Sequence, residues 1–224
     1  MNNYIFILLI SVSAITTLSI NPILEKDFKL ITYKTEDGGT IEASLFEGSK
    51  NLGVILAHGA VFNKESWYFL CRKLQSKGVT SISIDFRGYG NSKKGSSDDK
   101  AYDILGAVGY LKSKGFKNIA LVGGSMGGAA ILNALEIKTD EALKKVVLLS
   151  PASDIGMNNS TVEKLFVASE DEGLFSRVKT AFDSSVQPKQ FKIYEGSFHA
   201  QHMFKSDYAD ELTQLIIDFL TNWL

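Results

Sequence analysis

One short stretch of the sequence carries a serine in a setting that suits nucleophilic catalysis. Ser125 stands in Gly123-Gly124-Ser125-Met126-Gly127, which matches the pattern G-x-S-x-G. In this pattern the serine occupies a sharp, strained turn between a strand and a helix, so its hydroxyl projects outward. Glycine at the flanking positions avoids the clash that side chains would make where strand and helix meet. We therefore predict that Ser125 is a nucleophile.

A nucleophilic serine needs a base, and two histidines near the C-terminus are candidates. His199 follows the apolar run 191–194 and the loop 195–198, and His202 lies three residues later. An imidazole on a loop beyond a strand is free to approach a serine hydroxyl. The two histidines do not predict a metal site, because no third ligand lies at a recognisable spacing. His58 lies inside a turn and is expected to bond its own loop.

An acidic turn could supply the carboxylate that orients the imidazole. Glu170, Asp171 and Glu172 follow the strand-like run 164–168, and each could instead be a solvated charge near a helix N-terminus. Backbone donors for an oxyanion are expected after the strand-like run 53–57. Gly59 permits a turn there, so the N–H of Ala60 or Val61 could face the site, and Met126 directly after the serine would supply the second donor.

The elements that must position these residues alternate along the chain. Two strand-like runs, 27–35 and 40–46, flank Asp37-Gly38-Gly39 and predict a hairpin. Further strands are expected at 53–57, 80–85, 118–122, 144–149, 164–168 and 190–194, and helices at 64–76, 98–113, 127–137, 175–182 and 207–224. Such alternation predicts an α/β fold with a mostly parallel sheet covered by helices on both faces. Its ligand crevice lies beyond the carboxyl ends of the strands, where all the candidate residues fall.

Composition excludes several classes of protein. The 224 residues are 45% hydrophobic and 22% charged with a formal net charge of −1, which indicates one globular domain without a nucleic-acid-binding surface. Cys71 is the single cysteine and falls in a helical pattern, so we expect a buried, inert thiol.

The first 20 residues differ from the rest. Residues 4–20 carry no charge and begin with a strongly apolar run, which predicts a signal peptide or an N-terminal membrane anchor ahead of a domain at 27–224. The protein would then be secreted, periplasmic or anchored on the outer face of a membrane. It would be cytoplasmic if the segment is not a signal, and a buried element of the domain is the remaining interpretation.

Taken together, the motifs resemble those of the α/β-hydrolase superfamily over residues 28–224, in its small esterase-like and dienelactone-hydrolase-like forms. The matching motifs are, in order, His58-Gly59, Asp85-x-Arg87-Gly88-x-Gly90-x-Ser92, Gly123-x-Ser125-x-Gly127, the acidic turn 170–172 and Gly196-x-x-His199. The order nucleophile, acid, histidine is that of the family. The resemblance implies that Ser125 is the nucleophile, His199 the base, and Ala60 and Met126 the oxyanion donors. Spacing favours Glu172 as the acid, whereas residue type favours Asp171, and both stay open.

The resemblance implies a serine hydrolase, and a carboxylesterase acting on small or exposed acyl esters is the expected activity. No cofactor or metal is expected, and the partner is a small-molecule ester. Only about a dozen residues separate Ser150 from the next strand, so no sizeable lid is expected over the crevice. Phe62, Trp67, Met157 and Phe198 are candidates to line it. The alternatives are a peptidase or thioesterase of the same fold, and a catalytically inactive binding protein. The oligomeric state does not follow from the sequence.

Overall fold

The computed structural model describes residues 27–49 and 51–222, together with Met1. The expected leader, residues 1–20, falls outside this part of the chain apart from its first residue. The strands are β1 (Lys29–Lys34), β2 (Thr40–Phe46), β3 (Gly53–Ala57), β4 (Thr80–Ile84), β5 (Ile119–Gly124), β6 (Leu143–Leu149), β7 (Glu163–Ser169) and β8 (Lys189–Tyr194). The helices are η1 (Lys64–Trp67), α1 (Tyr68–Ser76), α2 (Ala101–Ser113), α3 (Met126–Ile137), α4 (Phe175–Ser184), η2 (Ala200–Lys205) and α5 (Ala209–Thr221).

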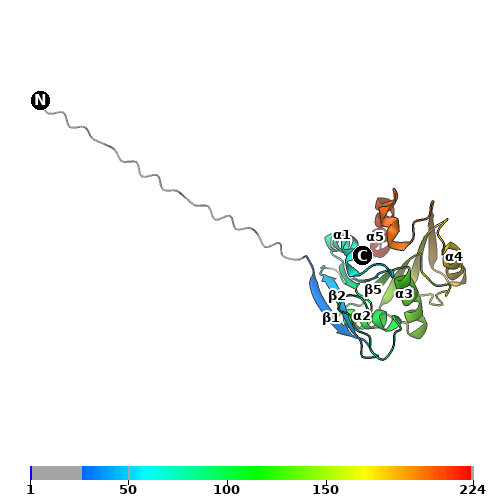
Figure 1. Cartoon of the computed structure of the whole chain (residues 1–224), viewed down its shortest axis with the longest axis horizontal. Coiled ribbons are helices and arrows are strands. Elements are labelled where there is room, and N and C mark those ends of the chain that lie inside the picture. The colour runs from blue at the N-terminus through cyan, green and yellow to red at the C-terminus, as the bar shows by residue number, and fades with distance from the viewer. Residues whose placement is uncertain (2–26, 50, 223–224) are drawn as a thin grey trace.

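The strands form one eight-stranded sheet in the order β1-β2-β4-β3-β5-β6-β7-β8. The hairpin β1-β2 is antiparallel and joins β4 in antiparallel register, whereas β3 to β8 and β4 run parallel. In Figure 1 the hairpin lies at one edge of the sheet and α4 lies toward the other. The mostly parallel sheet with an N-terminal antiparallel hairpin, predicted from the alternating pattern, is confirmed.

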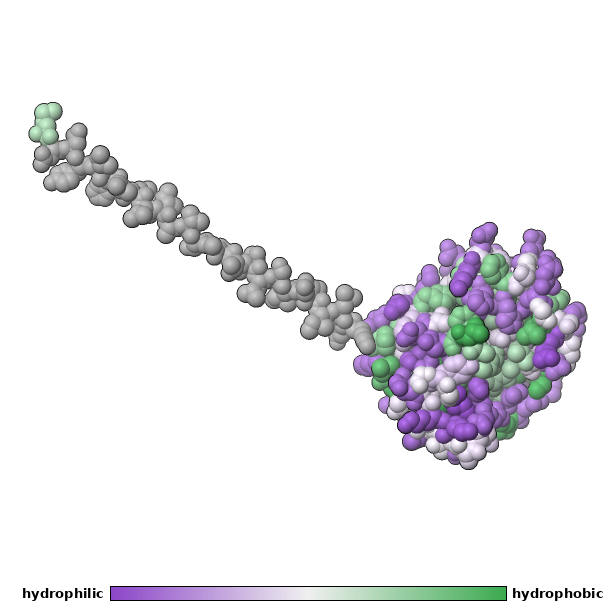
Figure 2. Space-filling model, viewed as in Figure 1, coloured by the Kyte–Doolittle hydropathy of each residue, from purple (hydrophilic) through white to green (hydrophobic). Residues whose placement is uncertain are grey.

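Helices cover both faces of the sheet because the strands are apolar on both sides. Along β3, Ile55 and Ala57 belong to the core that contains buried residues of α2, α3 and α4, while Val54 and Leu56 belong to the core under α1 and α5. Figure 2 shows hydrophobic side chains as separate spots on a mostly hydrophilic face. No helix among the described residues is long and apolar enough to cross a bilayer.

The Asp85–Ser92 segment has a structural role. The buried guanidinium of Arg87 bonds Asp103 Oδ1 at 2.7 Å and Asp37 Oδ2 at 2.8 Å. The Arg87 guanidinium holds the pKa of Asp37 well below its usual range. These bonds tie the β1-β2 turn and α2 to the segment that follows β4, and Ser92 Oγ donates to the Asp85 carbonyl oxygen at 2.7 Å.

Element boundaries depart from expectation mainly at helix ends. The last helix was expected to run from 207 to 224 but begins at Ala209, and a separate 3₁₀ helix, η2, directly follows His199. Helix α2 begins at Ala101 rather than Asp98: the N-cap is Lys100, and the Asp99 carboxylate accepts a bond from the Ala101 N–H at 2.9 Å in the turn before the helix.

Candidate active site

Ser125 lies between the end of β5 and the start of α3, at the corner that the motif predicts. Its backbone has φ 49° and ψ −110°, a conformation that L-residues rarely adopt and that costs about 1–3 kcal/mol. A Cβ at Gly123 would come within 2.7 Å of the Gly127 backbone, and one at Gly127 would come within 2.2 Å of the Ala57 carbonyl oxygen. The first clash is the expected one between strand and helix. The second involves the neighbouring strand β3, so the glycine at position 127 lets α3 begin directly against the end of β3.

His199 reaches the serine from the other end of the chain. Its Nε2 lies 2.9 Å from Ser125 Oγ, and its Nδ1 contacts Glu172 Oε2. His199 has extended backbone angles and precedes η2, so the imidazole stands free of the sheet. His202 lies within η2, where its ring packs against Phe62 with centroids 5.0 Å apart. The structure therefore brings His199, and not His202, to the serine.

Glu172 is the acid in contact with the imidazole, and Asp171 is not. The carboxylate of Glu172 is 1% exposed, and its Oε1 accepts bonds from Ser150 Oγ at 2.6 Å and from the Ser169 N–H at 3.2 Å. Asp171 is exposed, and its N–H donates to the Gly196 carbonyl oxygen. The alternative that Asp171 orients the imidazole is therefore wrong: the turn after β7 places its third residue, Glu172, and not its second, Asp171, against the imidazole.

The Glu172 contacts favour one arrangement of protons along the three side chains. Two donors, the Ser150 hydroxyl and the Ser169 N–H, converge on Oε1, which suits an ionised carboxylate that only accepts. An ionised Glu172 pairs with the tautomer of His199 that carries its proton on Nδ1. The unprotonated Nε2 faces Ser125 Oγ, as a general base for the serine hydroxyl requires.

The loop after β3 carries the expected oxyanion donor Ala60. The Gly59 N–H donates to Gln201 Oε1 at 2.8 Å, and the Ala60 carbonyl oxygen accepts a bond from the Tyr89 hydroxyl at 2.9 Å. Within the described chain, neither the Ala60 N–H nor the Met126 N–H donates to another group. Met126 is the first residue of α3, so its N–H also lies at the positive end of the helix dipole. Both donors are thus available to a ligand oxygen.

His58 and Cys71 are structural. His58 is fully buried, with Nδ1 2.8 Å from the Gly59 carbonyl oxygen and Nε2 accepting from the Phe86 N–H at 3.2 Å. Burial lowers the pKa of His58, which keeps the ring neutral between these two partners. Burial raises the pKa of the Cys71 thiol to about 12, so the thiol is inert at neutral pH.

The surroundings of Ser125 are open. Residues 150–162 between β6 and β7 form no helix or strand, so no lid domain is inserted there. Val61 is 80% and Phe198 41% exposed, whereas Trp67 and Met157, expected to line the crevice, are buried in the two cores. Those two expectations were wrong because apolar periodicity does not distinguish a crevice wall from a core.

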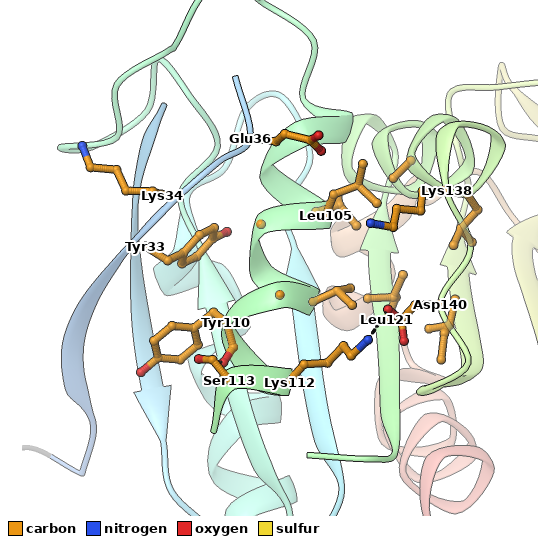
Figure 3. A pocket seen from close by; sticks show the side chains of 17 residues that line it. Tyr33, Lys34, Glu36, Leu105, Tyr110, Lys112, Ser113, Leu121, Lys138 and Asp140 are labelled. Carbon is orange, nitrogen blue, oxygen red and sulfur yellow. Dashed lines mark hydrogen bonds and ion pairs between the residues drawn. The ribbon is translucent and has the colours of Figure 1, made fainter. Parts of the chain in front are cut away.

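A cavity of about 600 Å³ flanks α2, away from Ser125, and none of its lining residues belongs to the candidate site. Figure 3 shows that Tyr33 and Tyr110 lie on one side of α2, while Lys112 pairs with Asp140 on the other. No group of three metal-binding side chains occurs in the described part of the chain.

Sequence reasoning missed three residues that support the site. Ser150 donates to Glu172, the triad acid. Gln201 accepts a bond from the Gly59 N–H, and the Tyr89 hydroxyl donates to the Ala60 carbonyl oxygen. Each makes its contact across the fold, so no motif could have marked it. The positions of Ser150 and Gln201, next to the end of β6 and two residues after His199, were the only available signals.

Comparison with known proteins identifies the family. The chain is 28% identical over 151 residues to the AB hydrolase superfamily protein YisY of Bacillus subtilis, across 61% of this chain and 56% of that protein. It spans about half the length of the curated relatives it matches. An esterase from Exiguobacterium antarcticum has a similar fold, with a TM-score of 0.71 and 16% identity over 84% of this chain and 98% of that one.

A second esterase of known structure, from a Rhodococcus species, gives the same TM-score of 0.71 at 16% identity, over 86% of this chain and 98% of that one. At such identities the likeness concerns the fold alone. The family described as alpha/beta hydrolase fold matches residues 54–202, which include Ser125, Glu172 and His199. The chain belongs to the alpha/beta hydrolase fold family.

Proposed function

We propose that this protein is a serine hydrolase that cleaves carboxylic esters through an acyl-enzyme. The observation that carries the proposal is the continuous contact from Glu172 through His199 to Ser125 Oγ, with 2.9 Å between His199 Nε2 and the hydroxyl. The N–H groups of Ala60 and Met126 are the hydrogen-bond donors that would stabilise the oxyanion of the transition state. The esterase names of several proteins with this fold agree with the proposal.

Each group has a defined task in this reaction. Ser125 Oγ attacks the ester carbonyl carbon while its proton passes to His199 Nε2, and Glu172 stabilises the resulting imidazolium. The Ala60 and Met126 N–H groups donate to the oxyanion, a contribution for which loss of one donor costs about 10²–10³-fold in kcat. The imidazolium then protonates the departing alcohol. A water molecule, deprotonated by His199, releases the acid and restores the serine.

The open surroundings favour esters with small or exposed acyl groups. The described residues include no lid that would enclose a long chain next to Ser125, and the exposed Val61 and Phe198 offer only partial apolar contact. Thioesters and peptides are the alternative substrates of this chemistry. A peptide makes the poorest leaving group, so activated esters are the sensitive first probe.

Turnover of p-nitrophenyl esters of graded acyl length tests the proposal. Residues 27–224 of the wild-type sequence should hydrolyse the short esters fastest, and Ser125→Ala should abolish turnover while retaining the wild-type circular dichroism spectrum. Ser76→Ala, an exposed serine at the end of α1, is the matched control and should retain full activity. Wild-type-like activity in Ser125→Ala would refute the assignment. A protein that hydrolyses no ester, thioester or peptide would fit the alternative of a binding protein.

Residues 1–20 add a proposal about location. We infer from their uncharged, apolar composition that they direct export or anchor the domain on the outer face of a membrane. A reporter fused to these residues should appear outside the cytoplasm or in the membrane fraction. A reporter that stays in the cytoplasm would contradict this proposal without affecting the enzymatic one.

A further inference from the structure

The segment that follows β6 holds the nucleophile by its backbone. The Ser125 N–H donates to the Leu149 carbonyl oxygen at 2.9 Å, and the Ala152 N–H donates to the Ser125 carbonyl oxygen at 3.0 Å. These two bonds fix the peptide groups on either side of the strained Ser125 backbone. The segment 149–152 is therefore part of what keeps the serine at its corner.

The same segment carries a buried serine with an unusual backbone. Ser150 is fully buried, has φ 45°, and donates its N–H to the Val167 carbonyl oxygen at 2.8 Å. A non-glycine residue at positive φ persists only where its surroundings impose it. Here the bond to β7 holds the backbone, and the side chain reaches Glu172 and the Ala200 N–H.

The Ser150 hydroxyl joins those two loops. Oγ lies 3.1 Å from the Ala200 N–H, which can only donate, so the hydroxyl accepts that bond. Its single proton is then free for Glu172 Oε1, 2.6 Å away. Since Ala200 directly follows His199, one hydroxyl fixes both the acid and the backbone that carries the imidazole.

We infer that Ser150 is a positioning residue of this site, acting through Glu172 on the orientation and tautomer of His199. The inference rests on the proposed function and extends it. With Oε1 occupied by Ser150 and by the Ser169 N–H, only Oε2 is left for His199 Nδ1. Without the hydroxyl, the carboxylate can rotate and the loop that carries His199 loses a tether, so Nε2 is less often aligned with Ser125 Oγ.

Kinetics of two substitutions at Ser150 test this role. Ser150→Ala should lower kcat about 10–100-fold, the range typical when a partner that orients a reacting group is lost, with KM within about threefold. Ser150→Gly suits the positive φ and also lacks the hydroxyl, so it should show the same loss even if Ser150→Ala folds poorly. Ser153→Ala is the control in the same loop, because Ser153 Oγ bonds only the Ile155 N–H in the described structure. Wild-type kcat in a folded Ser150→Gly variant would overturn the inference.

A double-mutant cycle separates positioning from a purely structural effect. In a Glu172→Gln background the imidazole is already misdirected, so adding Ser150→Ala should change kcat by less than about threefold. The same 10–100-fold loss in both backgrounds would show that Ser150 acts independently of Glu172, and would overturn the inference.

Nitrogen NMR of histidine provides a readout that needs no turnover. With ¹⁵N-labelled histidine, the His199 signals, identified by their absence in His199→Asn, should report the Nδ1–H tautomer in the wild type and a mixture of tautomers in Ser150→Ala. An unchanged spectrum would overturn the inference. If the wild type hydrolyses no substrate, the proposed function fails, while the spectra still decide whether Ser150 controls the imidazole.

Discussion

Exchange of Glu172 for its amide isolates the role of one carboxylate oxygen. In Glu172→Gln the side chain keeps its size, but one acceptor oxygen becomes an NH₂ donor. Two donors, Ser150 Oγ and the Ser169 N–H, face the Oε1 position, and one, His199 Nδ1, faces the Oε2 position. The amide oxygen should therefore turn toward the pair of donors, and the NH₂ group should face the imidazole.

Two donors cannot face each other, so the imidazole must move its proton. His199 would then carry hydrogen on Nε2 and accept at Nδ1, leaving no base toward Ser125 Oγ. Replacement of the triad acid by its amide in a serine protease lowers kcat about 10⁴-fold through the same wrong tautomer. We expect a loss of about 10³–10⁴-fold in kcat here, equivalent to about 4–5 kcal/mol in activation free energy.

Steady-state hydrolysis of a short p-nitrophenyl ester measures this loss. The control is Asp171→Asn, which makes the same chemical change one residue earlier on an exposed side chain and should keep kcat within about twofold of wild type, because exposed substitutions away from the site have small effects. Both variants should have wild-type circular dichroism spectra. Glu172→Gln that keeps more than a tenth of the wild-type kcat, or Asp171→Asn that loses most of it, would refute this reasoning.

Three further predictions concern the supports of the site. Gly127→Ala should destabilise the fold by about 3 kcal/mol or more, or prevent folding, because the new Cβ would lie 2.2 Å from a carbonyl oxygen of β3. Gly173→Ala is the control, because a Cβ there meets nothing within 4 Å. The two variants should differ clearly in melting temperature, and equal melting temperatures would contradict the close packing at position 127. Tyr89→Phe removes the hydroxyl that bonds the backbone of the Ala60 loop and should lower kcat about 3–10-fold, the equivalent of one hydrogen bond, with KM little changed; an unaffected kcat would show that the loop needs no such support. Cys71, with a thiol pKa raised to about 12, should resist iodoacetamide at pH 8 in the folded protein and react after unfolding, so fast labelling of the native protein would contradict its burial.

The local motifs of the chain predicted much of the fold. Short runs that are apolar at every position, such as 53–57 and 119–122, are typical of central parallel strands, and the glycine-bearing turn at 37–39 indicated the hairpin β1-β2. Position 125 was likewise predictable, because the glycines around it serve a steric need that the structure displays. Helix ends were less predictable, since the turn at Asp99 before α2 and the 3₁₀ helix after His199 depend on local bonds that periodicity does not reveal.

The choice of acid could not be made from the sequence. Asp171 and Glu172 are adjacent carboxylates in one turn, and residue type and spacing favoured different ones. The decision depends on Ser150 and Ser169, which lie at the ends of the paired strands β6 and β7 and both bond Glu172 Oε1. Buried polar networks of this kind are specified by tertiary contacts, which a local pattern does not contain.

Reaction with a fluorophosphonate probe tests the central claim most directly, because only an activated serine forms the covalent adduct. Mass spectrometry of the peptides from the labelled protein should place one adduct on Ser125, and His199→Ala should lose it while keeping the folded circular dichroism spectrum. An unlabelled wild-type protein, an adduct on another residue, or full labelling of His199→Ala would contradict the account.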